Sequence, residues 1–504
     1  MITVTSVTYK FNINGYHTKT IQAKRGLRQG DPISPLLFVI IMEYLNMCFR
    51  KIQKNPNFNH HAKCEKLHIT NLSFADDLLL FSRGDCMSVE LLMEAFNDFS
   101  DSTGLKLNPA KCKIYFGGVD ADTKQNIINI TKFREDPFPF RYLGVPLTSK
   151  KLSIHHYMPL IDKIMSRINH WSAKLLSYAG RAQLIKSVTF AIANYWMQCF
   201  PIPRSAIHKI EAMCRSFMWT GGADISRKSP IAWDNVCRPL NYGGLGIIDL
   251  KIWNKITMIK LLWNLSSKTD SLWVKWVHSY YLKHEGLMNV SIKPHTSWIM
   301  RTILKQRDSL VDIQQVWNRM LTSDKFRMTD IYLAICSNAP KVMWKNILRN
   351  NVARPRALIT MWFTCHGRLA TKQRLFRFGM ITDDRCCLCT KEEETINHLL
   401  FCCPETVHIW TKVLDWIQIP HVPRPRDEEM DWVCKSTSGK GWRASLLKLA
   451  ITKTVYGIWQ YRNDICYGNV IDKTKIGDNI MDMIVYRGWY NQKLRPHIAH
   501  LMTY

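Results

Sequence analysis

Residues 71–81 read Asn71-Leu-Ser-Phe-Ala-Asp-Asp-Leu-Leu-Leu-Phe81. Two short apolar runs separated by paired carboxylates are typical of a β-hairpin that carries Asp76 and Asp77 at its tip. Adjacent negative charges repel each other unless cations lie between them, and phosphoryl transfer uses two divalent ions about 3.5–4 Å apart held by carboxylate oxygens. The pattern therefore predicts a hairpin with a candidate Mg²⁺ site, although an Asp-Asp pair taken alone is also typical of a solvated turn.

Three further blocks surround this hairpin. Before it lies Arg25-Gly-Leu-Arg-Gln-Gly-Asp-Pro-Ile-Ser-Pro35, in which Asp31 can cap a helix over the apolar run from Leu36 to Phe49. After it come Thr103-Gly-Leu-Lys-Leu-Asn-Pro-Ala-Lys-Cys-Lys113 and Phe140-Arg-Tyr-Leu-Gly-Val-Pro146. In this order and spacing, the four blocks resemble the later conserved blocks of non-LTR (LINE-type) retrotransposon reverse transcriptases, which are RNA-directed DNA polymerases.

The resemblance implies roles for particular residues. Asp76 and Asp77 would be the catalytic, magnesium-binding pair of the palm. Lys111 would protonate the departing pyrophosphate as a general acid, and its alternative interpretation is an ordinary exposed basic residue. The residues implied to contact the RNA and DNA of the template–primer are Arg25, Arg28, Gln29, Gly30, Arg141, Tyr142, Leu143 and Gly144.

The chain departs from that family in one respect. The family has an earlier palm block, in which a third Asp bridges both metals, and this block should precede the loop at Arg25. No Asp or Glu occurs between Met1 and Gly30, and the position of Asp31 favours helix capping over metal binding. We therefore expect a reverse transcriptase fragment that binds nucleic acid but polymerises poorly. The alternative is an active enzyme, if upstream coding sequence or another chain supplies the strand.

A cysteine cluster predicts a second metal site. Four residues leave gaps of two, eight and four residues, which is zinc-knuckle spacing: Cys386, Cys389, His398 and Cys403. Three thiolates and one imidazole satisfy the tetrahedral preference of Zn²⁺ and leave no position for water, so the site should be structural. Cys387 or Cys402 could replace a ligand, and buried free cysteines are the alternative interpretation. The segment resembles the zinc-binding domain that follows plant LINE-type reverse transcriptases.

The charge balance indicates a polyanionic partner. The chain has 69 Lys and Arg against 40 Asp and Glu, a formal net charge of +29 spread along its length. This distribution favours nucleic acid over an anionic membrane surface, because a membrane anchor would place basic residues beside an apolar segment. Arg368 and Lys372, with Phe376 and Phe378 nearby, could hold RNA through phosphate contacts and stacking. A solvated helix face is the alternative.

The sequence also bears on location. No stretch has the roughly 18–20 apolar residues that a membrane span needs. Residues 1–20 read as two strands around the Asn14-Gly15 turn and lack the regions of a signal peptide. The 16 cysteines are diluted along the chain, which favours a reducing compartment. We therefore expect an intracellular protein, nuclear or cytoplasmic, that has no membrane span and is not secreted.

A chain of 504 residues should divide into several units, because single cores stop growing near about 250–300 residues. The expected class is α+β. The expected parts are a partial palm at 1–150, a helical thumb at 151–240, a helical connection at 241–340, a small zinc-binding domain at 341–415, and a linker with a C-terminal helical segment at 416–504. A non-enzymatic, zinc-dependent module that binds RNA or protein is the rival hypothesis.

Overall fold

The computed structural model describes residues 7–23, 26–148, 150–171, 176–222, 224–226, 229–283, 285–294, 296–337 and 339–502. The chain forms two compact units. The first comprises Met1–Lys150 with Lys268–Val290, and the second comprises Lys151–Ser267 with Ser291–Tyr504. The structure is 58% helical and 6% strand, which confirms the α+β class. Within the described ranges, no helix is both long and apolar enough to cross a bilayer.

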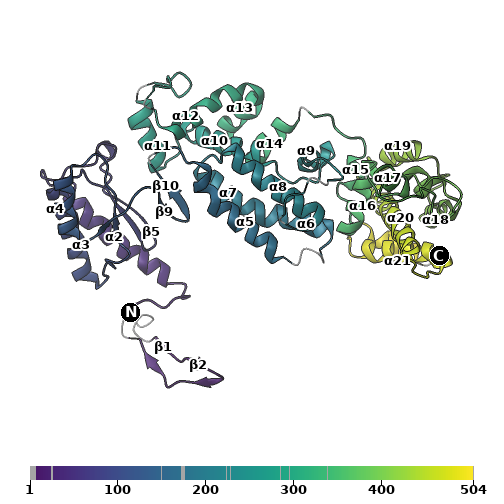
Figure 1. Cartoon of the computed structure of the whole chain (residues 1–504), viewed down its shortest axis with the longest axis horizontal. Coiled ribbons are helices and arrows are strands. Elements are labelled where there is room, and N and C mark those ends of the chain that lie inside the picture. The colour runs from purple at the N-terminus through teal and green to yellow at the C-terminus, as the bar shows by residue number, and fades with distance from the viewer. Residues whose placement is uncertain are drawn as a thin grey trace. The chain divides into compact units, whose positions relative to one another are not determined.

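Two helices form the core of the first unit. Helix α2 (Ser34–Ile52) lies against α3 (Cys86–Thr103), as Figure 1 shows. The carboxylate of Asp85 accepts a hydrogen bond from the backbone N–H of Ser88 at 2.8 Å, which fixes the start of α3, and Gly104 ends it with φ 74°. The buried core residues are Leu45, Cys48, Phe49, Ile52, Phe58, Leu92, Ala95, Phe96 and Phe99.

The predicted hairpin lies on this core. Strands β5 (Asn71–Phe74) and β6 (Asp77–Leu80) are antiparallel, and Phe74 pairs with Asp77. Because side chains alternate along a strand, Leu78 and Leu80 point to the same face, and both pack against the helices.

The other strands of the described residues also pair two by two. Asn14 and Gly15 join β2 to β3 with φ of 50° and 89°, which confirms the expected turn. The pairs are β1 (Thr8–Tyr9) with β4 (Ile21–Gln22), β2 (Asn12–Ile13) with β3 (Tyr16–His17), β7 (Lys113–Ile114) with β8 (Arg134–Glu135), and β9 (Phe140–Tyr142) with β10 (Val145–Leu147); α4 (Ala121–Thr131) precedes β8. Only the β7–β8 pair among these is parallel.

A distant segment completes the first unit. Helix α11 (Leu272–Val277) and the following turn η6 (His278–Leu282) fold back onto the loop at residues 63–66. The indole N–H of Trp276 donates to the carbonyl of Lys63 at 2.7 Å, and the backbone N–H of Lys66 donates to the Tyr280 hydroxyl at 2.9 Å. Sequence analysis assigns this segment to the helical connection, whereas its contacts are with the first unit.

The second unit is helical, with one isolated β-bridge between Arg385 and Glu393 in its described part. Its helices before the cysteine cluster are α5 (Met158–His170), α6 (Tyr178–Leu184), α7 (Phe190–Cys199), α8 (Arg204–Thr220), α9 (Trp233–Cys237), α10 (Leu250–Ser266), α12 (Trp298–Leu304), α13 (Gln314–Ser323), α14 (Met328–Cys336), α15 (Lys345–Leu348), α16 (Pro355–Cys365) and α17 (Lys372–Arg377).

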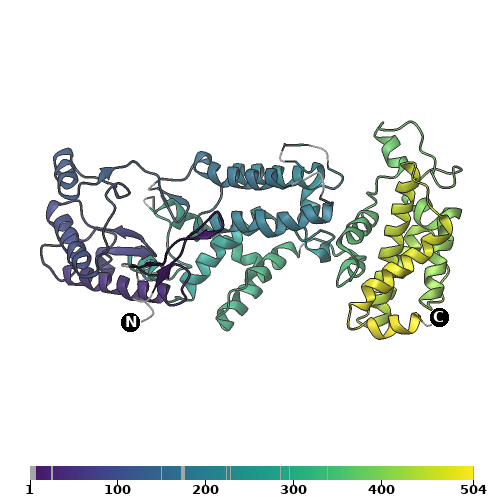
Figure 2. The same cartoon turned by 90° about the horizontal axis from the view of Figure 1, so that it is seen from below.

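The C-terminal helices pack around α20. These helices are α18 (Pro404–Trp416), α19 (Arg426–Ser436), α20 (Trp442–Cys466), α21 (Ile476–Trp489) and α22 (Arg495–Leu501). The yellow helices of Figure 2 include α20 and α21, which lie side by side. A Cβ atom at Gly457 would lie 2.5 Å from the side chain of Ile480, so the close approach of α20 and α21 requires glycine there.

The stretch from Pro420 to Glu429 lies near the start of the segment 416–504, in which sequence analysis expects a linker, and it is packed at its end. Helix α19 already begins at Arg426, and Glu429 is fully buried. The Glu429 carboxylate accepts hydrogen bonds from the Trp410 indole at 2.7 Å and from the Arg424 backbone N–H at 3.0 Å. These bonds satisfy a buried charge and hold the segment against α18.

Helix α20 also buries a cation. The side chain of Lys453 is 0% exposed, and its ammonium has no hydrogen-bond partner among the described residues. Burial, with smaller contributions from the charges of Arg354 and Arg487, lowers the pKa of Lys453 from 10.5 to about 8. Because the folded state holds the proton less tightly than the unfolded state, the ammonium destabilises the fold by roughly 3 kcal/mol below pH 8, and this cost fades as the pH rises toward 10.5.

Lys453→Met should therefore raise the free energy of unfolding at pH 7 by roughly 1–3 kcal/mol, because it keeps the apolar stem and removes the buried charge. Urea denaturation measures this, and the gain over the wild type should shrink between pH 8 and pH 10. Lys440→Met, at an exposed position just before α20, is the matched control and should change stability little. A Lys453→Met variant that is no more stable than the wild type at pH 7 would contradict the conclusion that the buried Lys453 ammonium destabilises the fold.

Candidate functional site

The hairpin tip presents two carboxylates to solvent. Asp76 and Asp77 are both exposed, and Ala75 precedes them with φ 50°. This left-handed conformation costs a residue with a Cβ atom roughly 1–2 kcal/mol, and such strain is found where function requires a particular turn. The two-residue turn places both Asp side chains at one end of the hairpin, as the sequence predicts.

Polar contacts fix the base of the hairpin to helix α2. The Asn71 side-chain amide donates to Asn46 Oδ1 at 2.7 Å, and the Gln53 amide donates to the carbonyl of His68 at 2.7 Å. The strand position is thus set by hydrogen bonds at one end and by the Leu78 and Leu80 contacts along its face. The tip is therefore held on a rigid element, which is what a metal site requires.

The structure brings the turn at 141–144 near the hairpin. Leu143 and Gly144 join β9 to β10 with φ of 48° and 81°, a type I′ turn. Burial raises the pKa of Tyr142, and the negative charge of Asp77 raises it further. The Asp77 carboxylate is therefore near enough to act on the Tyr142 hydroxyl. Arg141, which precedes Tyr142 in the sequence, is exposed.

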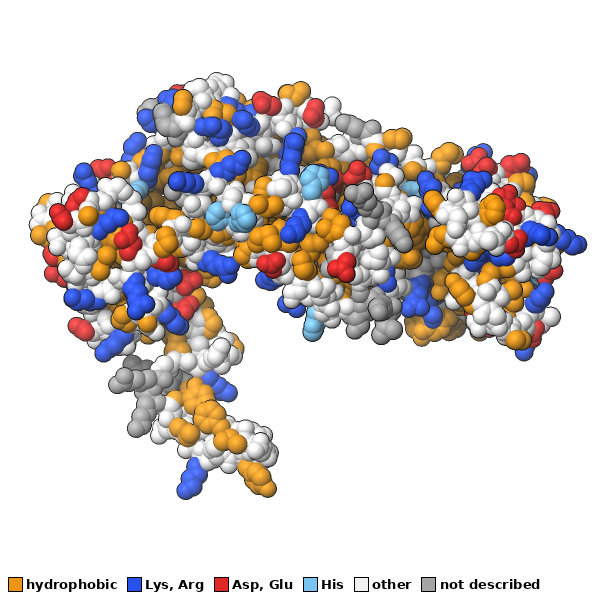
Figure 3. Space-filling view, viewed as in Figure 1, with side chains coloured by type: hydrophobic (Ala, Val, Ile, Leu, Met, Phe, Trp, Pro, Cys, Tyr) orange, Lys and Arg blue, Asp and Glu red, His pale blue; other side chains and the backbone are white. Residues whose placement is uncertain are grey.

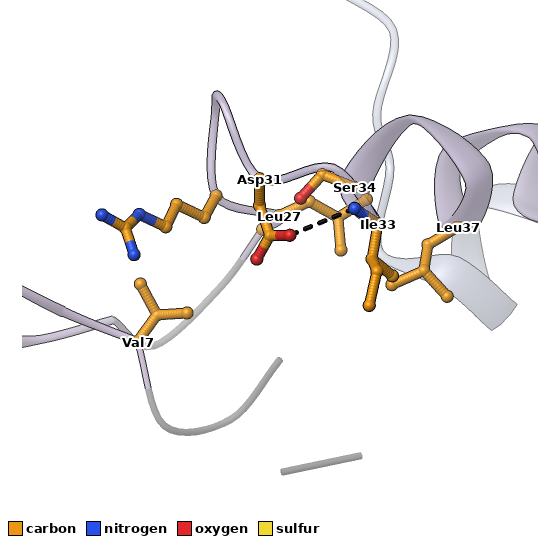
Figure 4. Close-up of a pocket in the computed structure, with 8 residues that line it drawn as sticks. Val7, Leu27, Asp31, Ile33, Ser34 and Leu37 are labelled. Carbon is orange, nitrogen blue, oxygen red and sulfur yellow. Dashed lines mark hydrogen bonds between the residues drawn. The ribbon is translucent and has the colours of Figure 1, made fainter. Parts of the chain in front are cut away.

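The loop before α2 lines a small hollow (Figure 4). Its lining includes Gly26, Leu27, Arg28 and Asp31. Arg28, Gln29 and Gly30 are exposed, and Gly30 has φ 88°. Arg25 lies outside the described residues.

Asp31 does not occupy the cap position that the sequence predicts. Helix α2 begins at Ser34, and Ile33 is its N-cap residue. The Asp31 carboxylate instead accepts a hydrogen bond from the Ile33 backbone N–H at 3.1 Å, drawn as a dashed line in Figure 4. This contact from Asp31 to the N–H two residues on is an Asx turn, and it closes the turn at residues 32–33 that precedes the helix.

Lys111 is exposed in a turn between α3 and β7. Its backbone N–H donates to the carbonyl of Asn108 at 3.0 Å, and the Asn108 side chain accepts from the Ala110 N–H at 3.1 Å. The local Asn-Pro turn thus determines where this lysine lies. A general-acid role for Lys111 stays a prediction.

Four ligand residues meet in the second unit. The ligand atoms of Cys386, Cys389, His398 and Cys403 all lie within 4.8 Å of one another, and Cys389 Sγ is 3.2 Å from His398 Nε2. Donors of this type and spacing fit a tetrahedral Zn²⁺ ion. Cys402 points elsewhere, with its thiol 3.6 Å from Asn397 Oδ1, so it does not join this group.

The local electrostatics favour thiolate at Cys386 and Cys389. A hydrogen bond with the Cys403 thiol lowers the pKa of Cys386 to about 5 and raises that of Cys403. Burial raises the pKa of Cys389, but the backbone N–H groups of residues 391 and 392 outweigh it and lower the net value. Hydrogen bonds from backbone amides to sulfur are a means of stabilising negative charge at a metal site.

His398 has an orienting partner that sequence analysis missed. Its Nδ1 lies 2.9 Å from Glu392 Oε2, which leaves Nε2 for the metal. A carboxylate on the distal imidazole nitrogen fixes the ring orientation in many metal sites. The acidic run Glu392-Glu-Glu394 between the cysteines and the histidine was the available signal.

The two basic residues assigned to RNA differ in their surroundings. Lys372 is half-buried, and its ammonium pairs with Asp383 at 3.1 Å. Arg368 is exposed and lines a cavity of about 390 Å³. The same cavity is lined by Arg356 and by the aromatic rings of Tyr178, Phe363, Tyr456 and Trp459. These partners are far apart in the sequence, so no local pattern could have indicated them.

Lys and Arg side chains elsewhere are widely distributed. Figure 3 shows them over many elements of the face in view. This agrees with the even spread of basic residues along the sequence.

Comparison with known proteins identifies the class. Residues 2–147 match the family described as "Reverse transcriptase (RNA-dependent DNA polymerase)", and residues 326–410 match the family described as "zinc-binding in reverse transcriptase". The chain therefore contains a reverse transcriptase domain and a zinc-binding domain of the reverse transcriptase type. The second match encloses all four residues of the cysteine and histidine cluster, and the first encloses the hairpin.

Retrotransposon proteins are among the relatives. A "Putative ribonuclease H protein" of Arabidopsis thaliana is 28% identical over 31% of this chain and 25% of its own length. The "Transposon TX1 uncharacterized 149 kDa protein" of Xenopus laevis is 24% identical over 47% and 18%, respectively. The "Retrovirus-related Pol polyprotein from type-2 retrotransposable element R2DM" of Drosophila melanogaster is 33% identical over 23% and 10%. The chain spans a quarter or less of the length of these three relatives.

Proposed function

We propose that this chain is the part of a retroelement reverse transcriptase that holds the primer end of a template–primer. Asp76 and Asp77 would bind Mg²⁺, and the neighbouring turn at Tyr142 would position the primer strand. The observation that carries this proposal is the hairpin that ends in two exposed carboxylates, one of which, Asp77, raises the pKa of Tyr142 in the neighbouring turn. The net charge of +29 supports a nucleic-acid partner.

The zinc-binding domain has a structural role in this proposal. Cys386, Cys389, His398 and Cys403 would hold one Zn²⁺ ion with no coordination position left for a reactant. The ion would stabilise a loop that is joined by one isolated bridge, Arg385 to Glu393. Such loops gain much of their folding free energy from the metal.

Primer extension on an RNA template with Mg²⁺ tests the catalytic proposal. Any synthesis by the chain should fall by at least about 100-fold in Asp76→Ala, because the substitution removes a metal ligand. Asp101→Asn, an exposed charge change on α3, is the matched control and should leave synthesis unchanged. Synthesis that survives Asp76→Ala would contradict the proposal.

The expectation that this chain alone polymerises poorly stays a prediction, so a second measurement addresses the site without turnover. Mn²⁺ can replace Mg²⁺ at carboxylate sites, and electron paramagnetic resonance measures its free fraction. With template–primer present, the wild-type chain should bind Mn²⁺ that an Asp76→Asn/Asp77→Asn variant does not bind. Equal Mn²⁺ binding by the two proteins would show that the hairpin carboxylates do not bind the metal ion.

Replacement of Cys389 tests the zinc proposal. Cys389→Ser should lower the zinc content by one ion per chain and lower the thermal midpoint of the zinc-binding domain, because a ligand is lost. Cys402→Ser, which changes an exposed thiol nearby, should leave both values unchanged. Inductively coupled plasma mass spectrometry gives the metal content. An unchanged zinc content in Cys389→Ser would show that the ligand set is wrong.

The cavity at Arg368 favours a second candidate function, single-stranded RNA binding by the second unit. Arginine and aromatic side chains around one cavity suit phosphate contacts and base stacking. Arg356→Ala/Arg368→Ala should weaken RNA binding and reduce the slope of log affinity against log salt by roughly 1.4, for two lost phosphate contacts. Lys435→Ala, which removes an exposed basic side chain of α19, is the control, and fluorescence anisotropy is the measurement. A double variant with the RNA affinity and salt slope of the control would exclude this cavity as an RNA-binding site.

A further inference from the structure

A second group of metal-ligating side chains lies in the zinc-binding part of the chain, separate from the four residues described above. Cys387, Glu394 and Cys466 each offer one ligand atom, and these atoms lie within 4.8 Å of one another. Cys387 belongs to the cysteine loop, Glu394 to the segment before His398, and Cys466 is the last residue of α20. We infer that these three residues form a second Zn²⁺ site, which ties the cysteine loop to the end of α20.

The separations suit a zinc ion. Zn–S bonds of about 2.3 Å and Zn–O bonds of about 2.0–2.2 Å at tetrahedral angles put a sulfur and an oxygen ligand roughly 3.5 Å apart. Cys387 Sγ lies 3.5 Å from Glu394 Oε2. The Cys466 thiol lies within the same 4.8 Å group, so a single ion can reach all three donors.

The carboxylate of Glu394 has one oxygen committed and one available. Oε1 accepts hydrogen bonds from Arg462 Nε at 3.0 Å, from Arg462 Nη2 at 2.6 Å and from the Lys372 backbone N–H at 2.8 Å. Oε2 faces Cys387, whose N–H and Sγ are both 3.5 Å away. The Arg462 contacts fix the orientation of a fully buried carboxylate, and they leave Oε2 directed at the Cys387 thiol.

The charges at this site balance when an ion is bound. Two thiolates and the Glu394 carboxylate carry three negative charges, which Zn²⁺ and the Arg462 guanidinium neutralise together. Each thiol releases its proton to solvent as its sulfur binds, and no electron is transferred. Cys466 keeps contact with solvent, which gives the ion and the protons a route. A set of bound charges that sums to zero is the arrangement that a largely buried site requires.

The site would act as a cross-link. Cys387 and Cys466 are 79 positions apart in the sequence, so one ion would join a loop with little regular structure to the longest helix of the C-terminal region. Closing a long loop removes conformational freedom from the unfolded chain, which stabilises the fold. Three protein ligands leave a fourth position for water, in contrast to the four-ligand site beside it.

Zinc counting on the full chain, kept reduced with a phosphine, tests the inference. The wild type should contain two zinc ions per chain, Cys466→Ser one, Cys389→Ser one, and the double variant none. Cys402→Ser should retain two. Cys466→His keeps a zinc ligand at the same position and should restore the second ion, which separates loss of a ligand from misfolding.

Cobalt substitution provides an independent measurement. Thiolate-to-Co²⁺ charge-transfer absorption scales with the number of Co–S bonds, and the two sites would have three and two. Cys387→Ser/Cys466→Ser should therefore lower this absorption by about two fifths at saturating cobalt.

One zinc ion in the wild type, lost in Cys389→Ser and kept in Cys466→Ser, would overturn the second site and leave the proposed function intact. Protein purified without reductant can carry a disulfide between Cys387 and Cys466, which mass spectrometry detects as a mass two daltons lower and as a cross-linked peptide. If reduction of that protein restores two zinc ions per chain, the result is compatible with the site. A Cys387–Cys466 cross-link that persists after treatment with the phosphine, in protein that holds one zinc ion per chain, would overturn the second zinc site in favour of a disulfide.

Discussion

The position of the β5–β6 hairpin on helices α2 and α3 is the constraint on which the rest of the first unit depends. Asp76 and Asp77 follow a strained Ala75 on a two-residue turn, and this geometry keeps both charges at one end of a short ribbon. Contacts with other parts of the unit hold this hairpin in place. Leu78 and Leu80 pack on α2 and α3, and Asn71 is hydrogen bonded to Asn46.

The zinc-binding part depends on buried candidate metal ligands in place of an apolar core. Its cysteine loop has little regular structure, yet Cys386, Cys403 and His398 are almost completely buried. Buried thiols and an imidazole are gathered at one point by backbone turns and by Glu392, so a metal ion would replace the apolar core that the loop lacks. The adjoining helices supply an ordinary core around α20, including fully buried Trp362 and Trp410.

Buried polar groups hold the C-terminal helices in one arrangement. Glu394 binds Arg462 across 68 positions of sequence, and Glu429 accepts bonds from Trp410 and from the Arg424 backbone. Each satisfied carboxylate has one compatible set of donors, so these contacts favour a single packing more than they add free energy. Lys453 is the exception, since no described group accepts its hydrogen bonds.

Patterns confined to short stretches of the sequence determined the hairpin, the Asn14-Gly15 turn, the helix that follows Pro32 and the spacing of the four candidate zinc ligands. Strand alternation, turn chemistry and metal-ligand gaps depend on neighbours within a few residues, so they can be read before folding. The tertiary structure alone decided which distant groups meet: Trp276 with Lys63, and Cys387 with Glu394 and Cys466. Those encounters depend on how helices pack and on which buried charges must be paired, and a linear pattern does not encode either one.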